Sequence, residues 1–294
     1  MLRNVNLLTY LWSSFMKMVY DNYIFDLYGT LIDIHTDEER KGLWQEMADY
    51  LKENFSSFYT GATLRKRYIE ICHEEEELLR SQNGHEWPEI RIEKVWARLI
   101  SEGCPNSVER KKQEDNKKTQ CSNSNNNNIA SILTDSKAIR NLCIFFRESS
   151  RDKFIVYDGV KETLEKLQGM GKKIFLLSNA QRAFTEKELS DAGLTDYFDD
   201  IFISSDKEIK KPQKEFLELL VSKNGLSIDK CVMIGNDIFS DVGVAAKNGM
   251  NSIFLNTYDF SEKKIDEEIK KLGIKGSCLT PLIIGDGDIR KILR

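Results

Sequence analysis

Short apolar runs alternate with amphipathic helical patterns along much of this chain. Five of the runs predict strands that are buried on both faces of a sheet: residues 23–25, 173–177, 201–203, 231–235 and 252–256. Between them, apolar residues recur at helical spacing over residues 161–170, 183–192, 213–223 and 241–248. Strands that alternate with helices in this way predict βαβ units and a parallel sheet.

Residues 34–150 break this alternation. Apolar residues recur at helical spacing over residues 43–55, 64–80 and 89–102, and helix resumes around residues 129–148. We therefore expect an all-helical insertion between the first strand and the second. Within it, residues 105–128 are rich in polar side chains and end in four consecutive asparagines. Such a stretch buries too little apolar surface to offset the entropy of ordering, so we expect a mobile loop there.

The α/β part of the chain is expected to be assembled from residues 18–33 and 151–294, with residues 34–150 inserted. Residues 1–17 do not follow the pattern of the rest, and Met18 directly precedes the first strand. These 17 residues are interpreted as a possible N-terminal extension. After the last buried strand, residues 262–272 predict one helix and residues 282–284 a late strand.

Composition narrows the class of protein. The chain has 294 residues, 40% hydrophobic and 31% charged, which is typical of a soluble globular protein of about two domains. Its formal net charge is −4, from 43 basic and 47 acidic residues, so no nucleic-acid or membrane surface is expected. Leu7–Phe15 is apolar but too short to span a membrane and a poor signal peptide. The run His73–Glu77 lacks the second histidine of a zinc protease motif and predicts a solvated helix face.

Cysteine and histidine usage points to a reducing compartment without a zinc site. The six cysteines have no CxxC spacing, and the chain has three histidines. A cytoplasmic location fits this pattern best. The oligomeric state cannot be read from the sequence.

Each predicted strand of the sheet ends in polar residues. Asp26 closes the first strand and is followed by Gly29 and Thr30; Ser178 and Asn179 close the second. Taken singly, Asp26 could belong to an Asx turn, and Ser178-Asn179 could cap a helix. The carboxyl ends of parallel strands meet at one edge of a sheet, however, where catalytic groups lie.

Two later segments add charge to the same edge. Lys211 precedes Pro212 at the start of a helix, and Gly235-Asn236-Asp237 closes the fourth strand, with Asp241 four residues further on. Singly, Lys211 could be an exposed lysine at a helix entry, and Asp237 and Asp241 could cap the next helix. Together with Asp26 they supply a nucleophile, a cation and carboxylates for magnesium, which is the set that phosphoryl transfer needs.

These four motifs, in this order over residues 22–256, resemble those of the haloacid dehalogenase-like (HAD) hydrolase superfamily, in the branch with a helical cap inserted after the first strand. They are Asp26-Leu27-Tyr28-Gly29-Thr30, Ser178-Asn179, Lys211 and Gly235-Asn236-Asp237-Ile238-Phe239-Ser240-Asp241. The resemblance implies an α/β fold, a Rossmann-like parallel sheet core with an inserted all-helical cap domain. It also implies a cap that closes over the site and selects a small phosphorylated metabolite.

The resemblance further implies a role for each motif residue. Asp26 would attack phosphorus and form an aspartyl-phosphate that water hydrolyses. Lys211 would stabilise the charge of the transferring group, and Ser178, Asn179 and Thr30 would bind that group. Magnesium would be held by the Asp26 carboxylate, the Tyr28 main-chain carbonyl and the fourth motif, for which Asn236, Asp237 and Asp241 are the candidates.

Two positions depart from the usual phosphatase pattern and leave alternatives open. Tyr28 stands where phosphatases of the superfamily carry a second aspartate as general acid and base; a phenol can donate a proton but is a poor base. Asn236 stands where an aspartate is common, so either Asn236 or Asp237 would reach the metal. A magnesium-dependent phosphatase is favoured; the alternatives are a metal-independent 2-haloacid dehalogenase and a non-catalytic binder of a phosphorylated ligand.

Overall fold

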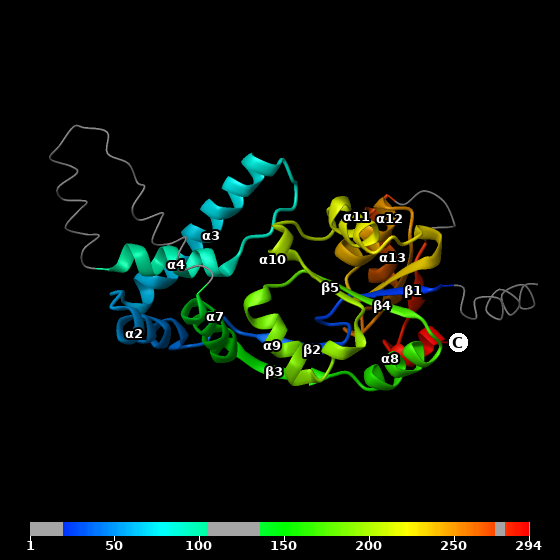
Figure 1. Cartoon of the computed structure of the whole chain (residues 1–294), viewed down its shortest axis with the longest axis horizontal. Coiled ribbons are helices and arrows are strands. Elements are labelled where there is room, and N and C mark those ends of the chain that lie inside the picture. Colours follow the sequence, from blue (N-terminus) through cyan, green and yellow to red (C-terminus); the bar gives the residue numbers. More distant parts are fainter. Residues whose placement is uncertain (1–19, 105–135, 274–279, 294) are drawn as a thin grey trace, which may run out of the picture. The chain divides into compact units, whose positions relative to one another are not determined.

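A computed structural model of the chain describes residues 20–104, 136–273 and 280–293 (Figure 1). The chain divides into two compact units. One, the sheet unit, comprises residues up to Ile34, Phe154–Ala180 and Glu188–Arg294; the other, the helical unit, comprises His35–Lys153 and Gln181–Lys187. The predictions made for residues 1–17 and 105–128 lie outside the described residues.

The sheet unit is built on six parallel strands in the order β5-β4-β1-β6-β7-β8. This arrangement confirms the predicted α/β class with a parallel, Rossmann-like sheet. In chain order the strands are β1 (Asn22–Phe25), β4 (Lys173–Ser178), β5 (Asp200–Ile203), β6 (Cys231–Gly235), β7 (Asn251–Leu255) and β8 (Leu282–Ile284). β1 pairs with β4 on one side and with β6 on the other, so the chain reverses its direction of sheet growth at β1. A ligand crevice is expected at such a reversal, beyond the carboxyl ends of the strands.

Side chains of β1 alternate between two apolar cores, one on each face of the sheet. Tyr23 and Phe25 pack with α8 (Val160–Gly169) and α9 (Arg182–Ala192). Ile24 packs on the opposite face with α11 (Lys214–Lys223) and α12 (Gly243–Lys247). In Figure 1, α8 and α11 lie on opposite sides of the strands. Because β1 is buried on both faces, its end is held rigidly.

Shorter elements complete the sheet unit. Ile265 of α13 (Glu262–Lys271) packs in a small core with Ile238, Val242 and Phe254. The single-turn elements are η1 (Thr195–Tyr197), α10 (Ser204–Lys207), η2 (Ile228–Lys230), the π-helical turn η3 (Ile238–Val242) and η5 (Ile289–Leu293).

Four helices make up most of the helical unit: α2 (Leu43–Phe55), α3 (Gly61–Asn83), α4 (Ile92–Gly103) and α7 (Lys137–Ser150). Trp44, Tyr68, Trp96 and Phe146 meet in their core, with Trp44 and Tyr68 ring centroids 5.0 Å apart. β2 (Ile32–Thr36) and β3 (Arg151–Val156) form a separate two-stranded sheet. The chain passes between the two units within these two strands, and twice more at residues 180–181 and 187–188, the latter within α9.

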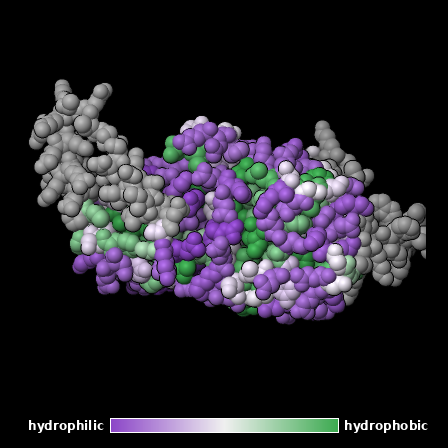
Figure 2. All heavy atoms as spheres, in the orientation of Figure 1, coloured by the Kyte–Doolittle hydropathy of each residue, from purple (hydrophilic) through white to green (hydrophobic). Residues whose placement is uncertain are grey.

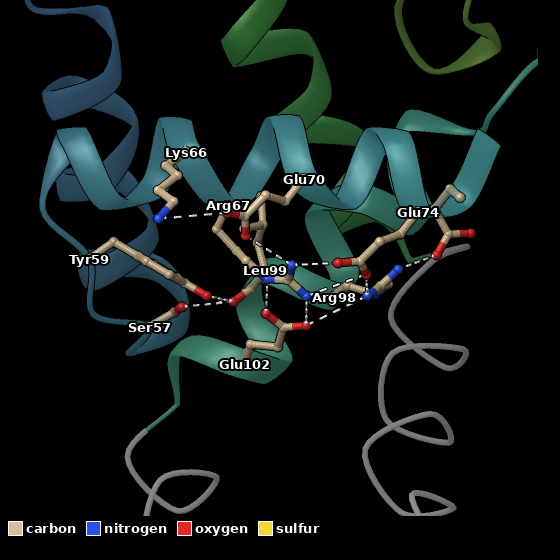
Figure 3. Close-up of polar contacts among 10 residues, drawn as sticks. Ser57, Tyr59, Lys66, Arg67, Glu70, Glu74, Arg98, Leu99 and Glu102 are labelled. Atoms are coloured by element: carbon tan, nitrogen blue, oxygen red, sulfur yellow. Dashed lines mark hydrogen bonds and ion pairs between the residues drawn. The ribbon is translucent and has the colours of Figure 1, made fainter. Parts of the chain in front are cut away.

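Ion pairs join α3 to α4 in the helical unit (Figure 3). The Arg67 guanidinium donates to both carboxylate oxygens of Glu102, at 2.7 and 2.9 Å, and to Glu74 at 2.7 Å. Arg98 donates to Glu75 at 2.6 Å, and Glu75 is buried. The expectation of a fully solvated face for His73–Glu77 is therefore wrong at Glu75, because Arg98 from the next helix neutralises its charge.

Polar and charged residues cover most of the face drawn in Figure 2, with smaller hydrophobic areas between them. Within the described part of the chain, no helix combines the length and the apolar character that crossing a membrane requires.

Candidate active site

Asp26 lies directly after β1, at the point where the ends of β1, β4 and β6 come together. Its main-chain N–H donates to the Ile234 carbonyl at 2.9 Å, which extends the pairing with β6, and the residue is 8% exposed. The chain then turns at Gly29, whose φ of +80° lies in the left-handed region that favours glycine. A Cβ on Gly29 would lie 2.2 Å from Asn236 Nδ2, so glycine also allows the loop to approach Asn236.

The buried Lys211 ammonium joins three parts of the sheet unit. Its Nζ donates at 2.7 Å to each of three acceptors: Asp26 Oδ1, Asp241 Oδ1 and the Leu177 carbonyl of β4. Lys211 is 2% exposed, so these bonds form away from solvent. An ammonium has three N–H donors, and each has an acceptor here. The structure thus brings together the predicted nucleophile, the predicted cation and one predicted acid.

Burial and charge oppose each other in this cluster. Burial alone lowers the pKa of Lys211, but the carboxylates of Asp241 and Asp26 outweigh it and the pKa is raised above its ordinary value. Burial raises the pKa of Asp241 to about 7, against the attraction of Lys211 and with the repulsion of Asp26. Lys211 therefore stays protonated at neutral pH, where it offsets the charge of the two acids.

The Thr30 hydroxyl lies between an Asp26 carboxylate oxygen and the Asn236 amide oxygen. Its Oγ1 is 3.3 Å from Asp26 Oδ2 and 3.2 Å from Asn236 Oδ1. A hydroxyl carries one proton, so it donates to one of these oxygens at a time. The second carboxylate oxygen of Asp26 and the amide oxygen of Asn236 are consequently neighbours.

The two aspartates of the fourth motif lie in different surroundings. Asp237 is exposed, and its carboxylate accepts a bond from Ser240 N at 2.7 Å as the cap of η3. Asp241 is buried, and its Oδ2 accepts from Asp237 N at 3.0 Å while its Oδ1 accepts from Lys211. A Cβ on Gly235 would lie 2.0 Å from Asp241 Oδ2, so a side chain there would collide with this carboxylate.

The oxygens around Asp26 have the chemistry of a magnesium site. Mg²⁺ binds hard oxygen ligands and usually keeps several waters, so it needs few protein donors. The Asp26 carboxylate, the Asn236 amide oxygen and the Tyr28 main-chain carbonyl are oxygens of this kind, and Thr30 Oγ1 lies within 3.3 Å of both Asp26 Oδ2 and Asn236 Oδ1. Across residues 20–104, 136–273 and 280–293, no group of three or more His, Cys, Asp and Glu side chains could hold a metal. The candidate magnesium ligands are therefore one carboxylate, that of Asp26, and two neutral oxygens, those of Asn236 and Tyr28.

The residues at the end of β4 differ in their contacts. Ser178 is the last residue of β4, and within the described residues its buried Oγ has no hydrogen-bond partner. A buried hydroxyl without a partner has a proton available for an acceptor that the protein itself does not supply. The Asn179 side chain instead bonds to the main chain of Lys211, donating to its carbonyl at 2.9 Å and accepting from its N–H at 2.8 Å. Asn179 thereby fixes the loop that carries the lysine.

Tyr28 reaches a residue that the sequence motifs did not identify. Its hydroxyl donates to Glu188 Oε2 of α9, and Glu188 is 2% exposed. A carboxylate so deeply buried near the nucleophile is a site feature, but Glu188 lies inside an ordinary amphipathic helix pattern. The only signal in the sequence is an acid at a position that faces the sheet.

Comparison with known proteins agrees with this geometry. The family model of haloacid dehalogenase-like hydrolases matches residues 20–249. The chain is 31% identical over 117 residues to the phosphoglycolate phosphatase of Vibrio parahaemolyticus serotype O3:K6, covering 40% of this chain and 50% of that protein. It is 27% identical over 124 residues to the ribulose-1,5-bisphosphate 5-phosphatase of Halopiger xanaduensis, covering 38% and 52%. The chain thus spans about half the length of the curated relatives it matches.

Among solved structures, a 2-haloacid dehalogenase from Pseudomonas syringae pv. tomato DC3000 has the same fold. The TM-score is 0.52 at 16% identity, over 86% of this chain and 99% of that one.

Proposed function

Because the chain belongs to the haloacid dehalogenase-like hydrolases, we propose that it is a magnesium-dependent phosphatase of a small phosphorylated metabolite, acting through an aspartyl-phosphate on Asp26. One observation carries this proposal: Lys211 Nζ bonds both Asp26 and Asp241 at 2.7 Å at the carboxyl end of the sheet. The curated relatives named as phosphatases support a phosphorylated substrate.

In the first step an Asp26 oxygen forms a bond to phosphorus while the bond from phosphorus to the leaving oxygen breaks. Lys211 stabilises the charge of the phosphoryl group, and the Ser178 hydroxyl, the Asn179 amide and the Thr30 hydroxyl are its proposed further donors. Water then attacks phosphorus, inorganic phosphate departs and the Asp26 carboxylate is restored.

Magnesium bound by Asp26, the Tyr28 carbonyl and Asn236 would neutralise charge on the phosphoryl oxygens. We propose Asn236 over Asp237 as the side-chain donor of the fourth motif, since Asn236 lies beside Thr30 while Asp237 caps η3. Asp241 is proposed to act through Lys211, because both of its oxygens accept bonds within the protein.

The test is hydrolysis of p-nitrophenyl phosphate by the wild type with magnesium, the wild type with chelator, and Asp26→Asn with magnesium. We expect turnover only in the first case, and capture of a radiolabelled phosphoenzyme from the wild type alone. Asp21→Asn is the matched control, since the Asp21 side chain is 62% exposed and pairs with Lys172. Full turnover by Asp26→Asn would overturn the proposal.

A second candidate is a metal-independent 2-haloacid dehalogenase. It is favoured by the Tyr28 hydroxyl, which donates to Glu188, because displacement of halide needs no proton donor for the leaving group. Halide release from 2-chloropropionate in chelator, without phosphatase activity, would establish this alternative. Tight binding of a phosphorylated ligand with neither activity would instead indicate a non-catalytic binder.

We also propose a cytoplasmic location. Among the described residues, Cys72, Cys143 and Cys231 are free thiols, which supports a reducing compartment.

A further inference from the structure

Within the described residues, the acidic N–H groups next to Asp26 donate to acceptors of the protein itself. The three N–H groups of Lys211 bond Asp26, Asp241 and the Leu177 carbonyl. Both Asp241 oxygens are bonded within the protein, to Lys211 Nζ and to Asp237 N, and Asp241 is 1% exposed, so neither oxygen faces a substrate. The ammonium thus stabilises charge without an N–H left for protonating a leaving group.

The Tyr28 hydroxyl also donates its proton to an acceptor within the protein. Its O–H donates to Glu188, a carboxylate that α9 holds at 2% exposure. A phenol has one proton, so a bond to Glu188 withholds that proton from a substrate oxygen. In the described part of the site this leaves the alcohols of Thr30 and Ser178, which are no stronger acids than an alcohol leaving group.

A site whose described residues hold no proton donor for the leaving group discriminates between leaving groups. When phosphorus is transferred to Asp26, the electron pair of the broken P–O bond stays on the leaving oxygen. That oxygen must then depart as an anion and take its proton from solvent later. Departure is easy for a carboxylate, whose acid has a pKa of about 4, harder for a phenolate, whose acid has a pKa of about 10, and hardest for an alkoxide, whose conjugate alcohol is a weaker acid than either.

We propose that this phosphatase acts on acyl and aryl phosphates in preference to alkyl phosphates, because the Glu188–Tyr28 bond withholds the proton that an alkoxide leaving group needs. This inference rests on the proposed phosphatase function and narrows its substrate class.

The first test compares kcat/KM for acetyl phosphate, phenyl phosphate and phosphoglycolate with the wild-type protein and magnesium. A general acid is worth about 10²–10⁴-fold, so we expect phosphoglycolate to be slower than acetyl phosphate by at least that factor. Values for the three compounds within about tenfold of one another would overturn the inference, since a general acid flattens this dependence. No phosphate release from any of the three would instead contradict the proposed function itself.

The second test changes the acceptor. Glu188→Met removes it at similar volume and frees the phenol, so we expect the rate on phosphoglycolate relative to acetyl phosphate to rise about tenfold or more. Adding Tyr28→Phe to Glu188→Met should abolish the gain, and Glu188→Gln, which keeps an acceptor oxygen, should retain the wild-type ratio. If Glu188→Met does not fold, Glu188→Gln still tests the inference through the ratio of the two rates.

The matched control is Glu165→Met. Glu165 accepts a bond from the Tyr197 hydroxyl at 2.9 Å, the same kind of pair at a distant place on α8. It should leave the ratio of the two rates unchanged. A folded Glu188→Met protein with the wild-type ratio would overturn the assignment to the Glu188–Tyr28 bond.

Discussion

At the residue scale, Lys211 is the point where the charges of the site are balanced. It lies between the Asp26 and Asp241 carboxylates, each 2.7 Å from its Nζ, and is almost wholly buried. Removing one member of a buried ion cluster costs more than the cluster contributes, because it leaves uncompensated charge in a medium of low polarity.

We therefore expect Lys211→Met to abolish turnover and to lower the free energy of unfolding by about 3–5 kcal/mol at pH 7. Urea denaturation followed by circular dichroism measures this change. The neighbouring Lys210→Met is the matched control and should cost little, since Lys210 is only half-buried. Wild-type stability of Lys211→Met would contradict the structure of the cluster.

Asp241 predicts a pH dependence of stability. Burial raises its pKa in the folded protein to about 7 from an ordinary value of 3.8, so the folded chain keeps a proton that the unfolded chain loses at lower pH. The folded state then binds more protons between about pH 4 and 7. The contribution of Asp241 to stability is accordingly greatest in acid, falls as the pH rises through this range, and is constant above it.

Replacing Asp241 with Asn should remove this component of the slope, as measured by urea unfolding in chelator from pH 4 to 8. Asp237→Asn lies in the same turn, and Asn caps helices as well as Asp does, so it should keep the wild-type slope. If the free energy of unfolding depends on pH with the same slope in the wild type and in Asp241→Asn, the prediction is wrong.

The residues that the sequence could identify are those with a fixed place in a motif. Asp26 and Lys211 were predicted from strand ends and helix starts, and the structure brings them into contact. Glu188 was missed because a buried acid within a helix has no local signature; its meaning depends on Tyr28, which lies far away in sequence. Only the packing of α9 on the sheet joins the two.

At the element scale, continuous apolar runs predicted the sheet well. The late run at residues 282–284 is β8, and residues 43–55 form α2. The pair β2 and β3 was missed, because a two-stranded sheet with exposed faces has no apolar run to reveal it. The π-helical turn η3 was not predicted, since the predicted helix over residues 241–248 includes only its last two residues. In this turn Val242 N donates to the Asp237 carbonyl at 3.4 Å, and the Asp237 and Asp241 carboxylates accept bonds from main-chain N–H groups.

The junction of β6 and η3 is expected to tolerate no side chain at Gly235. Gly235→Ala would place Cβ 2.0 Å from Asp241 Oδ2, so the carboxylate must move away from Lys211. We expect a loss of about 1–3 kcal/mol in the free energy of unfolding, together with loss of turnover. Gly169→Ala in α8 has open space and is the control; it should be neutral or stabilising.

At the scale of the whole molecule, the residues proposed to bind magnesium and phosphate all belong to the sheet unit. Magnesium with orthovanadate, a phosphate analogue, should stabilise that unit by about 2.7 kcal/mol at a hundred times the dissociation constant. Hydrogen exchange should slow at the ends of β1, β4 and β6. The Asp26→Asn variant should lose this protection, and a wild-type protein that gains none would contradict the proposed site.

The central place of β1 in the sheet has a consequence for biosynthesis. β1 is made early, yet Asn22 pairs with Lys173 and with Cys231, which are translated much later. At about 5–20 residues per second, roughly 10–40 s separate translation of Asp26 from that of Asp241. Until Lys173 is made, the apolar strand has no neighbour in the sheet, and until Lys211 is made, the nucleophile has no counter-ion. The nascent chain therefore exposes an apolar strand, of the kind that chaperones bind, until its partner strands have been translated.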